Sequence, residues 1–572
     1  MTDRPTAGLS DCVKKHAQKA YERDAKGHQT FDAFLETLVK PESSAALPIT
    51  EDLSHPLSHY YISSSHNTYL SGNQLWGKIT TDSYKDVLMR GCRCIEVDIW
   101  DGDSPSSSEA EAESPKTDHD VNKLSGMLKK GLSKLRSQSP SAHDAPDSPK
   151  GHAEQMPTPW RTNSGRYEPV IYHGYTATRE MPFRKMCEAV REYAFRTTDL
   201  PLIVSLEVHC SPAQQDIMVE LMNDYWKPYL YRAPAAFSDS TPLPPLATLK
   251  KTILVKVKYT PPEKAKAAQS KNTHSEHQDS SGTEDEGAMK KGKISEGLSK
   301  MGILTRASHF RDFDQPEAKI PTHVFSLGES KLLDACEQQP DKLFKHNLHH
   351  FMRAYPKGTR VRSSNLDPAP LWRFGLQMVA LNFQRINAAM MLNAAQFEGT
   401  GGWVLKPKGY LPVEGKQPKP ERITCDLSIK ILAAQGLGHR DDIPDAYVKC
   451  ELHVESQTGP GQMQIPNGGK SKGGQRKYRT ATRHNRDPDF CGELAHFPNI
   501  ANVVPELSFV RIKIMDDALA QKDRLLGWVC YRLDRLPQGL LLVPLRGEDF
   551  KLTGGKLLLE SHTKILTTAQ AT

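Results

Sequence analysis

The chain has 572 residues, of which 37% are hydrophobic and 25% are charged, and its formal net charge is +7. This length exceeds what one hydrophobic core usually serves, so two or three domains are expected. The 40 prolines and a mean hydropathy of −0.57 indicate sizeable unstructured segments. The N-terminus has no apolar leader and no run approaches the length of a membrane span, which predicts a soluble protein with at most peripheral membrane contact.

The ten cysteines are scattered and include no CxxC pair. Reduced thiols in a cytosolic protein are the simplest account of that spacing. The modest positive charge favours an anionic partner, without deciding between a membrane surface, nucleic acid and a phosphorylated substrate.

Residues 1–51 contain one or two amphipathic segments, for example 31–39, and no complete oxygen-rich calcium-binding loop. We expect a short helical lead-in, at most an EF-hand remnant, whose apolar face docks on the body of the protein.

From 52 to 261, strand patterns alternate with helix patterns. Strands are predicted at 59–63, 92–101, 170–174, 200–210 and 252–258, and helices at 83–89, 183–195 and 214–225. The pattern resumes over 320–411, with strands at 322–327, 350–356 and 378–383 and a helix at 331–336. Such alternation is typical of a parallel sheet covered by helices, and the number of units predicts one closed (β/α)8 TIM-like barrel built from both halves.

Two segments without a steady apolar period interrupt the barrel, an insertion at 103–167 and a linker at 262–319. Both are predicted to be disordered. Each contains a basic amphipathic piece, at 123–136 and 297–306, which is compatible with a helix lying on anionic lipid and equally with a transient helix in a solvated loop. After a Pro- and Lys-rich hinge, residues 421–565 show alternating strands separated by turns, which predicts an all-β sandwich.

The central strand of the first half is 92–101. Ile95, Val97 and Ile99 point to one side, so Glu96 and Asp98 lie together on the other. Two like charges at that separation favour a cation between them. An exposed edge strand with two solvated acids is the plain alternative.

Several other predicted strands also end in polar residues, and barrel enzymes place their catalytic groups at strand ends. Asn67, Glu96, Asp98 and Glu207 are hard oxygen donors suited to Ca²⁺ or Mg²⁺, with Ca²⁺ favoured. His66 and His173 are candidates to stabilise phosphoryl oxygens or to protonate a leaving alkoxide. The remaining candidates suit further phosphates and a ring, namely Lys256, Lys258, Arg353, the Ser326 hydroxyl and the flat face of Tyr355. Together these groups fit a polyphosphorylated phosphodiester.

Four segments closely resemble the X region of eukaryotic phosphoinositide-specific phospholipase C: 64–74 (SSHNTYLSGNQ), 91–102 (GCRCIEVDIWDG), 171–176 (IYHGYT) and 204–210 (VSLEVHC). Three more look like its Y region: 362–365 (RSSN), 378–384 (MVALNFQ) and 402–407 (GWVLKP). The architecture is most similar to the delta-type and to compact plant and fungal forms. The family usually has a short turn where this chain has 103–167.

The resemblance implies Ca²⁺ ligation by Asn67, Glu96, Asp98 and Glu207, and catalytic roles for His66, His173 and Glu96. It implies that Lys256, Lys258, Ser326 and Arg353 hold the 4- and 5-phosphates, and that Tyr355 packs on the inositol ring. The expected reaction hydrolyses phosphatidylinositol 4,5-bisphosphate to diacylglycerol and inositol 1,4,5-trisphosphate through a cyclic phosphate. Glu96 is the expected base, with Glu207 less favoured, and His173 protonates the leaving diacylglycerol.

The sandwich resembles a C2 domain, with 443–448 (IPDAYV) similar to its first calcium loop. Asp445, Asp516, Asp517 and Asp523, with Asp441 and Asp442 nearby, supply loop carboxylates for Ca²⁺-dependent lipid docking, although Ala518 stands where another acid is expected. The expected partners are the phosphoinositide and an anionic membrane surface. We expect a monomer without a nucleic-acid partner, cytoplasmic and recruited peripherally to membrane.

Two alternatives remain open at this point. A glycerophosphodiester phosphodiesterase is also a metal-dependent barrel with paired acids and histidines, but it has no need of Lys256, Lys258 and Arg353. Equal turnover of glycerophosphoinositol and of the bisphosphorylated lipid would support that reading. A non-catalytic phosphoinositide-binding scaffold would bind the lipid without turnover, although the presence of both histidines and all four metal ligands argues against it.

Overall fold

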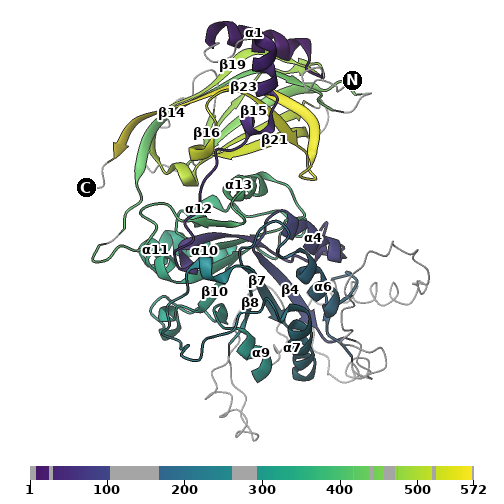
Figure 1. Ribbon diagram of the computed structural model, residues 1–572, viewed down its shortest axis with the longest axis vertical. Coiled ribbons are helices and arrows are strands. Elements are labelled where there is room, and N and C mark those ends of the chain that lie inside the picture. Colours follow the sequence, from purple (N-terminus) through teal and green to yellow (C-terminus); the bar gives the residue numbers. More distant parts are fainter. Residues whose placement is uncertain are drawn as a thin grey trace, which may run out of the picture.

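The computed structural model describes residues 8–24, 30–102, 167–174, 176–259, 293–416, 418–438, 442–455, 470–472, 475–517 and 523–569. These residues form an α/β barrel and an all-β domain beside it (Figure 1). Among the described helices, none combines the length and the apolar character that crossing a membrane requires.

In the described part of the chain, eight parallel strands close into a barrel. Their order around it is β1 (Tyr60–Ser65), β12 (Met378–Leu381), β11 (Phe351–Tyr355), β10 (His323–Gly328), β9 (Arg306–Ser308), β8 (Ile253–Lys258), β7 (Leu202–Val208) and β4 (Cys94–Trp100). The ring closes because β1 pairs with β12 on one side and, through Ser64 and Cys94, with β4 on the other. The prediction of a closed TIM-like barrel is confirmed.

Helices cover the outside of the barrel (Figure 1). They are α4 (Thr81–Met89), α6 (Phe183–Tyr193), α7 (Pro212–Trp226), α9 (Glu296–Met301), α10 (Glu329–Gln338), α11 (Pro340–His349), α12 (Ala369–Trp372) and α13 (Ala388–Phe397). Helix α6 shows why these helices pack against the barrel. Its apolar residues recur at helical spacing and are all fully buried, namely Phe183, Met186, Cys187 and Val190.

Two sequence predictions need correction here. The strand expected at 170–174 is only β5 (Val170–Ile171), which pairs antiparallel with β4 and with β6 (Met181–Pro182) and is not a barrel strand. The disordered linker expected over 262–319 is wrong for 293–319, since α9 and β9 lie there and β9 completes the barrel. Leu298 and Leu304 are buried, so the segment 297–306 packs into the protein and is not a free lipid-binding helix. The insertion 103–167, its amphipathic piece 123–136 and the linker up to 292 lie outside the described residues, apart from Tyr167.

The second domain is a β-sandwich. It contains β14 (Arg422–Gln435), β15 (Asp445–His453), β16 (Lys470–Lys472), β17 (Gln475–Arg479), β18 (Arg483–His484), β19 (Asp489–Val503), β20 (Phe509–Asp516), β21 (Arg524–Arg532), β22 (Gly539–Arg546) and β23 (Leu552–Ala569). These strands pair antiparallel, and a single residue pair, Trp528 with Arg546, joins β21 to β22. Buried residues from both halves, such as Val448 and Ile512 with Ile429 and Leu559, share one core. The predicted all-β sandwich is confirmed.

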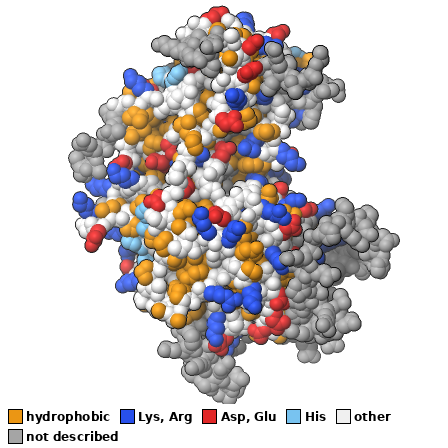
Figure 2. Space-filling view, in the orientation of Figure 1, with side chains coloured by type: hydrophobic (Ala, Val, Ile, Leu, Met, Phe, Trp, Pro, Cys, Tyr) orange, Lys and Arg blue, Asp and Glu red, His pale blue; other side chains and the backbone are white. Residues whose placement is uncertain are grey.

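The barrel and the sandwich share hydrophobic contacts. Trp372 of α12 packs against Phe509 of β20 with ring centroids 5.8 Å apart, and the Arg373 guanidinium donates to the Leu507 carbonyl at 3.1 Å. Helix α13 lies against β21 at the same junction (Figure 1). On the face shown in Figure 2, Lys and Arg side chains are interspersed with acidic and hydrophobic ones over both domains.

The predicted helical lead-in is present as α1 (Asp11–Asp24), α2 (Phe31–Leu38) and α3 (Pro41–Ser44). Its apolar face docks on the sandwich, where Val13, Ala17 and Leu35 contact Leu432 and Leu558. Figure 1 shows α1 lying along the sandwich, away from the barrel.

Candidate active site

The candidate site lies on two layers of side chains inside the barrel. An apolar plug fills the lower end, formed by Ile62, Cys94, Ile203, Leu254, Val324, Phe351 and Met378. Because every second residue of a strand points to the same side, the residues two positions further along form the next inward layer. That layer includes Glu96, Ser205, Lys256, Ser326 and Arg353, and the layer beyond it includes His66, Asp98, Glu207, Lys258, Tyr355 and Asn382. Strand register confirms the levels, since Glu96 pairs with Ser205, Ser205 with Lys256, and Ser326 with Arg353.

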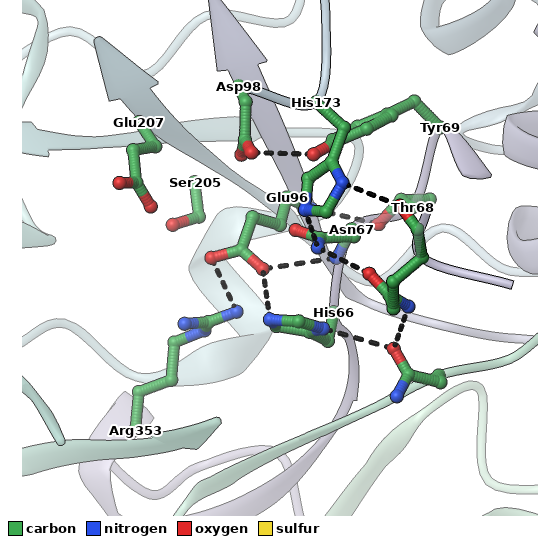
Figure 3. A network of polar contacts seen from close by, with 12 residues as sticks. His66, Asn67, Thr68, Tyr69, Glu96, Asp98, His173, Ser205, Glu207 and Arg353 are labelled. Atoms are coloured by element: carbon green, nitrogen blue, oxygen red, sulfur yellow. Dashed lines mark hydrogen bonds and ion pairs between the residues drawn. The ribbon is translucent and has the colours of Figure 1, made fainter. Parts of the chain in front are cut away.

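Glu96 lies at the centre of the site, where it contacts residues from several elements (Figure 3). One of its oxygens lies 2.8 Å from an Arg353 guanidinium nitrogen, and the other accepts a hydrogen bond from the Asn67 backbone N–H at 3.1 Å. His66 Nε2 lies 4.0 Å from that second oxygen. Burial by itself would raise the pKa of Glu96, but the Arg353 charge, helped by the hydrogen bond from the Asn67 N–H, outweighs burial and the pKa is lowered. The carboxylate is therefore ionised at neutral pH and available as a base or a ligand.

A chain of amide hydrogen bonds orients the two histidines and Asn67. The Asn382 side-chain oxygen accepts from Gln74 Nε2 at 3.2 Å and faces His66 Nδ1 at 3.0 Å, so His66 carries a proton on Nδ1. Asn67 Nδ2 donates to the Gln74 side-chain oxygen at 3.0 Å and faces His173 Nε2 at 3.2 Å. Both Asn67 side-chain contacts use its nitrogen, so its side-chain oxygen points away from Gln74 and His173.

His173 is held from the opposite end of its ring. Its Nδ1 donates to the Gln74 backbone carbonyl at 2.8 Å, which leaves Nε2 as the acceptor facing Asn67. Burial is the main cause that lowers the pKa of His173, and burial likewise lowers the pKa of His66. Both rings are therefore neutral at pH 7 in the free protein. Gly174, next to His173, allows the Trp100 ring to approach, since a Cβ there would lie 2.5 Å from that ring.

Cationic and hydroxyl groups line the other side. Lys256 is buried, its ammonium donates to the Ser205 hydroxyl at 3.2 Å, and burial followed by repulsion from Arg353 lowers its pKa to about 8. The Ser326 hydroxyl is buried without a hydrogen-bond partner in the described residues. Tyr355 lies at the upper edge of the barrel beside Gly328. A Cβ on Gly328 would lie only 3.4 Å from the Tyr355 ring. Lys258, at the end of β8, is exposed to solvent.

Comparison with known proteins agrees with this geometry. Residues 53–259 match the model for the phosphatidylinositol-specific phospholipase C X domain, and residues 298–409 match the model for its Y domain. Residues 425–543 match the C2 domain. The chain belongs to the phosphatidylinositol-specific phospholipase C family.

Individual relatives carry the same family name. The chain is 33% identical over 394 residues to 1-phosphatidylinositol 4,5-bisphosphate phosphodiesterase 1 of Candida albicans, a match covering 62% of this chain and 31% of the relative. It is 27% identical over 558 residues to the human delta-1 phosphodiesterase, covering 92% of this chain and 63% of the relative. The crystal structure of S. officinalis PLC21 superposes with a TM-score of 0.67 at 26% identity, covering 98% of this chain and 64% of that one. The chain thus spans less than two thirds of the length of each of these proteins.

The four expected calcium ligands lie on neighbouring elements. Asp98 of β4 is in register with Glu207 of β7, Glu96 lies one layer below, and Asn67 follows β1. They are hard oxygen donors of the kind that Ca²⁺ prefers. Their carboxylates are turned to protein partners, with Asp98 accepting from the Tyr69 hydroxyl at 2.5 Å and Glu207 lying 3.3 Å from His209 Nε2. The three carboxylates are not among the described groups whose ligand atoms all lie within 4.8 Å. The residues fit the ion in chemistry and placement, and sharing it requires these side chains to rotate.

The acids predicted to bind Ca²⁺ in the C2 domain each face a donor from the protein. Arg524 pairs with Asp516 at 2.9 Å and with Asp442 at 2.5 Å. The other contacts are Asp517 with Arg479 at 2.6 Å, Asp445 with His484 at 2.9 Å and Asp523 with the Tyr447 hydroxyl. Among the described residues, no three of these acids converge within 4.8 Å. Asp441 and Ala518 lie outside the described residues.

Sequence reasoning did not assign roles to Gln74, Asn382, Ser205 and Tyr69. Gln74 and Asn382 stand inside segments that carry the family resemblance, but an amide in a loop has no spacing rule that reveals its partner. Ser205 could have been found, because it is two residues before Glu207 on the same face of β7.

Proposed function

We propose that this chain is a calcium-dependent phosphoinositide phospholipase C. It hydrolyses phosphatidylinositol 4,5-bisphosphate to diacylglycerol and inositol 1,4,5-trisphosphate by way of a cyclic phosphate. The relatives named above carry that phosphodiesterase activity in their names, and this chain holds the family's X, Y and C2 regions. The single observation that carries the proposal is the position of Glu96, ionised between Arg353 and His66 inside the barrel.

The acid–base chemistry follows from that position. Glu96 accepts the proton of the inositol 2-hydroxyl, whose oxygen attacks the 1-phosphate and closes the cyclic ester. The ester oxygen of diacylglycerol leaves with a proton from His173 Nε2. That nitrogen is unprotonated in the free protein, so the negative phosphate must first raise the pKa of the ring and load it with a proton. Water then opens the cyclic phosphate with the proton transfers reversed.

The cationic side of the site holds the remaining phosphates. Lys256 and Arg353 are buried cations in the same layer of the barrel interior, and Ser326 adds a hydroxyl donor that has no hydrogen-bond partner among the described residues. Lys258 adds a solvent-exposed ammonium at the rim, and Tyr355 covers the inositol ring. A substrate lacking the 4- and 5-phosphates would leave Lys256 and Arg353 without their anions.

Asn67, Glu96, Asp98 and Glu207 would hold the Ca²⁺, with the Asn67 oxygen already turned away from its hydrogen-bonded neighbours. The bound ion lowers the pKa of the 2-hydroxyl and neutralises charge that develops on the phosphate. These side chains position it by exchanging their contacts with Arg353, Tyr69 and His209.

The same proposal includes a peripheral, cytoplasmic location at an anionic membrane, supported by the C2 match and by the absence of a membrane-crossing helix among the described ones. We propose that the chain acts as a monomer and has no nucleic-acid partner.

The test is Ca²⁺-dependent release of inositol trisphosphate from mixed vesicles containing phosphatidylinositol 4,5-bisphosphate. We expect release by the native chain and a loss of at least about 10³-fold in Glu96→Gln, because the base and one metal ligand are removed together. Glu329→Gln is a matched control, since Glu329 is buried in an ion pair with Arg360 on the barrel but does not reach the site. Vesicle binding without any release, or equal release by both forms, would overturn the proposal.

A further inference from the structure

Helix α1 is attached to the sandwich by polar contacts at both ends. Near its start, the Ser10 N–H donates to the Gln435 side-chain oxygen at 3.1 Å, and the Gln435 amide donates back to the Gly8 carbonyl at 3.0 Å. At its other end Arg23 pairs with Glu560 of β23 at 2.6 Å. Together with the buried Val13 and Ala17, these contacts hold one face of the helix in a fixed position.

On that fixed helix, Cys12 and His16 are four residues apart and so lie on the same side. Both face Asp489 at the start of β19: His16 Nε2 lies 2.8 Å from Asp489 Oδ1, and the Cys12 thiol hydrogen-bonds the same carboxylate. One ligand atom from each of the three residues lies within 4.8 Å of the other two. In the described part of the chain this is the one group of three or more such side chains that converges so closely.

The surroundings support ligand binding rather than a plain ion pair. The His16 side chain is only 11% exposed and that of Asp489 is 33% exposed, so the cluster is partly shielded from water. The Cys491 N–H donates to Asp489 Oδ1 at 2.7 Å and fixes the carboxylate. The Cys491 thiol is close enough to Cys12 to contribute to the raised pKa of the Cys12 thiol. A hydrogen bond between His16 and Asp489 needs neither thiol, so it does not account for the convergence of a sulfur on the same point.

We propose that Cys12, His16 and Asp489 form a binding site for a divalent cation of intermediate softness, of which Zn²⁺ is the leading example. One thiolate, one imidazole and one carboxylate are ligands that zinc accepts together, and helix α1 supplies the first two while β19 supplies the third. Ca²⁺ is disfavoured because it takes oxygen ligands. The site lies on the sandwich, away from the barrel chemistry, and a bound ion would clamp α1 to β19.

The probe is Co²⁺, which reports thiolate and imidazole ligands by its visible spectrum. Under reducing conditions, the full chain with one equivalent of Co²⁺ should show tetrahedral d–d bands and a sulfur-to-cobalt charge-transfer band, both bleached by one equivalent of Zn²⁺. Cys12→Ser should abolish the charge-transfer band, and His16→Gln should weaken cobalt binding by at least tenfold. Cys336→Ser removes a half-buried thiol on the barrel helix α10 and should leave the spectrum unchanged.

A second readout does not depend on colour. Zn²⁺ should raise the unfolding temperature of the native chain by at least about 2 °C, and the increase should disappear in His16→Gln, which keeps the thiol. The proposal is overturned if no charge-transfer band forms, or if the band survives in Cys12→Ser and is lost in Cys491→Ser. Cobalt bound only at the oxygen-rich barrel site would give no sulfur band and would also count against it.

Discussion

Gln74 determines which atom of Asn67 faces the barrel interior. Its side-chain oxygen accepts a hydrogen bond from Asn67 Nδ2 at 3.0 Å, so the Asn67 oxygen is presented on the other side. The orientation of Gln74 is itself fixed, since its Nε2 donates to the Ser363 hydroxyl at 2.9 Å and to the Asn382 oxygen at 3.2 Å. A residue outside the expected ligand set therefore holds one of the ligands in place.

Gln74→Ala is expected to reduce the rate of inositol trisphosphate release about 10- to 100-fold and to raise the Ca²⁺ concentration needed for half-maximal activity. Without Gln74, the Asn67 amide loses its fixed orientation. Measuring release across a calcium titration checks both effects. Gln384→Ala is the matched control, because the Gln384 side chain also donates to the Ser363 hydroxyl, at 3.3 Å, but in the described part of the chain it hydrogen-bonds neither Asn67 nor the two histidines. Equal calcium requirements in Gln74→Ala and the native chain would contradict the positioning role.

The alternation of apolar and polar residues predicted which side chains point into the barrel, because that alternation is a local property of each strand. Glu96 and Asp98 could be placed on one face because a strand has a period of two, and the structure places both inside the barrel. Strand β9 could not be found, because three half-buried residues, Arg306, Ala307 and Ser308, carry no apolar signal of their own. Their strand character comes from pairing with β8 and β10 on either side.

Side-chain partners were harder to predict than positions. The C2 acids occupy the expected loops, but the bases that face them, such as Arg479 and Arg524, come from strands whose register the sequence does not reveal. Likewise the contact between Cys12 and Asp489 joins positions 477 residues apart. Long-range pairs of this kind depend on how α1 docks on the sandwich, and the sequence does not reveal which surface its apolar face meets.

We expect Lys256 to give substrate binding a pH dependence. Its pKa is lowered to about 8, first by burial and then by Arg353, so the ammonium is charged below pH 8 and neutral above it. Only the charged form attracts phosphate, and at pH 9 about a tenth of the population retains it. We expect the affinity for soluble inositol trisphosphate to fall about tenfold between pH 7 and pH 9.

In Lys256→Arg the decline should be largely abolished, because a guanidinium remains charged over that range. Calorimetric titration with inositol trisphosphate measures the affinity at each pH. Lys250→Arg serves as the control, since Lys250 precedes β8 at the opposite end of the strand and pairs with Asp199 at 3.3 Å. The same decline in native and Lys256→Arg proteins would assign the pH effect to another group.

We expect Arg524 to compete with Ca²⁺ for the acids of the C2 domain. It pairs with Asp442 and Asp516, and these contacts must be given up before either carboxylate ligates an ion. Because surface ion pairs contribute about 0.2–1 kcal/mol each and Arg524 makes two, Arg524→Gln should lower the Ca²⁺ concentration for vesicle binding by about two- to thirtyfold. Sedimentation with anionic vesicles measures this. Arg483→Gln, which removes a pair with Glu493 on β19, should bind like the native chain. Vesicle binding independent of Ca²⁺ in all three proteins would exclude a calcium site there.

His346 makes the barrel less stable in acid. It is 8% exposed, its ring stacks on Phe325 with centroids 5.5 Å apart, and burial, followed by the charges of His350 and Lys406, lowers its pKa to about 3. In the unfolded chain a histidine has a pKa of about 6.5, so the unfolded state binds the proton more readily. The stability that depends on neutral His346 is therefore complete above pH 6.5 and decreases as the pH falls toward 3. At pH 5 the free energy of unfolding has decreased by about 2 kcal/mol for this reason.

His346→Phe keeps an aromatic ring in the stack but cannot take up a proton. The decrease in the free energy of unfolding between pH 7.5 and pH 5 should then be about 2 kcal/mol smaller than in the native chain, as measured by urea titration followed by circular dichroism. His562→Phe tests the assignment, because that side chain is 62% exposed and its surroundings change little on unfolding. A native decrease that persists in full in His346→Phe would mean that another buried group, such as His453 on β15, whose pKa burial also lowers to about 3, dominates acid unfolding.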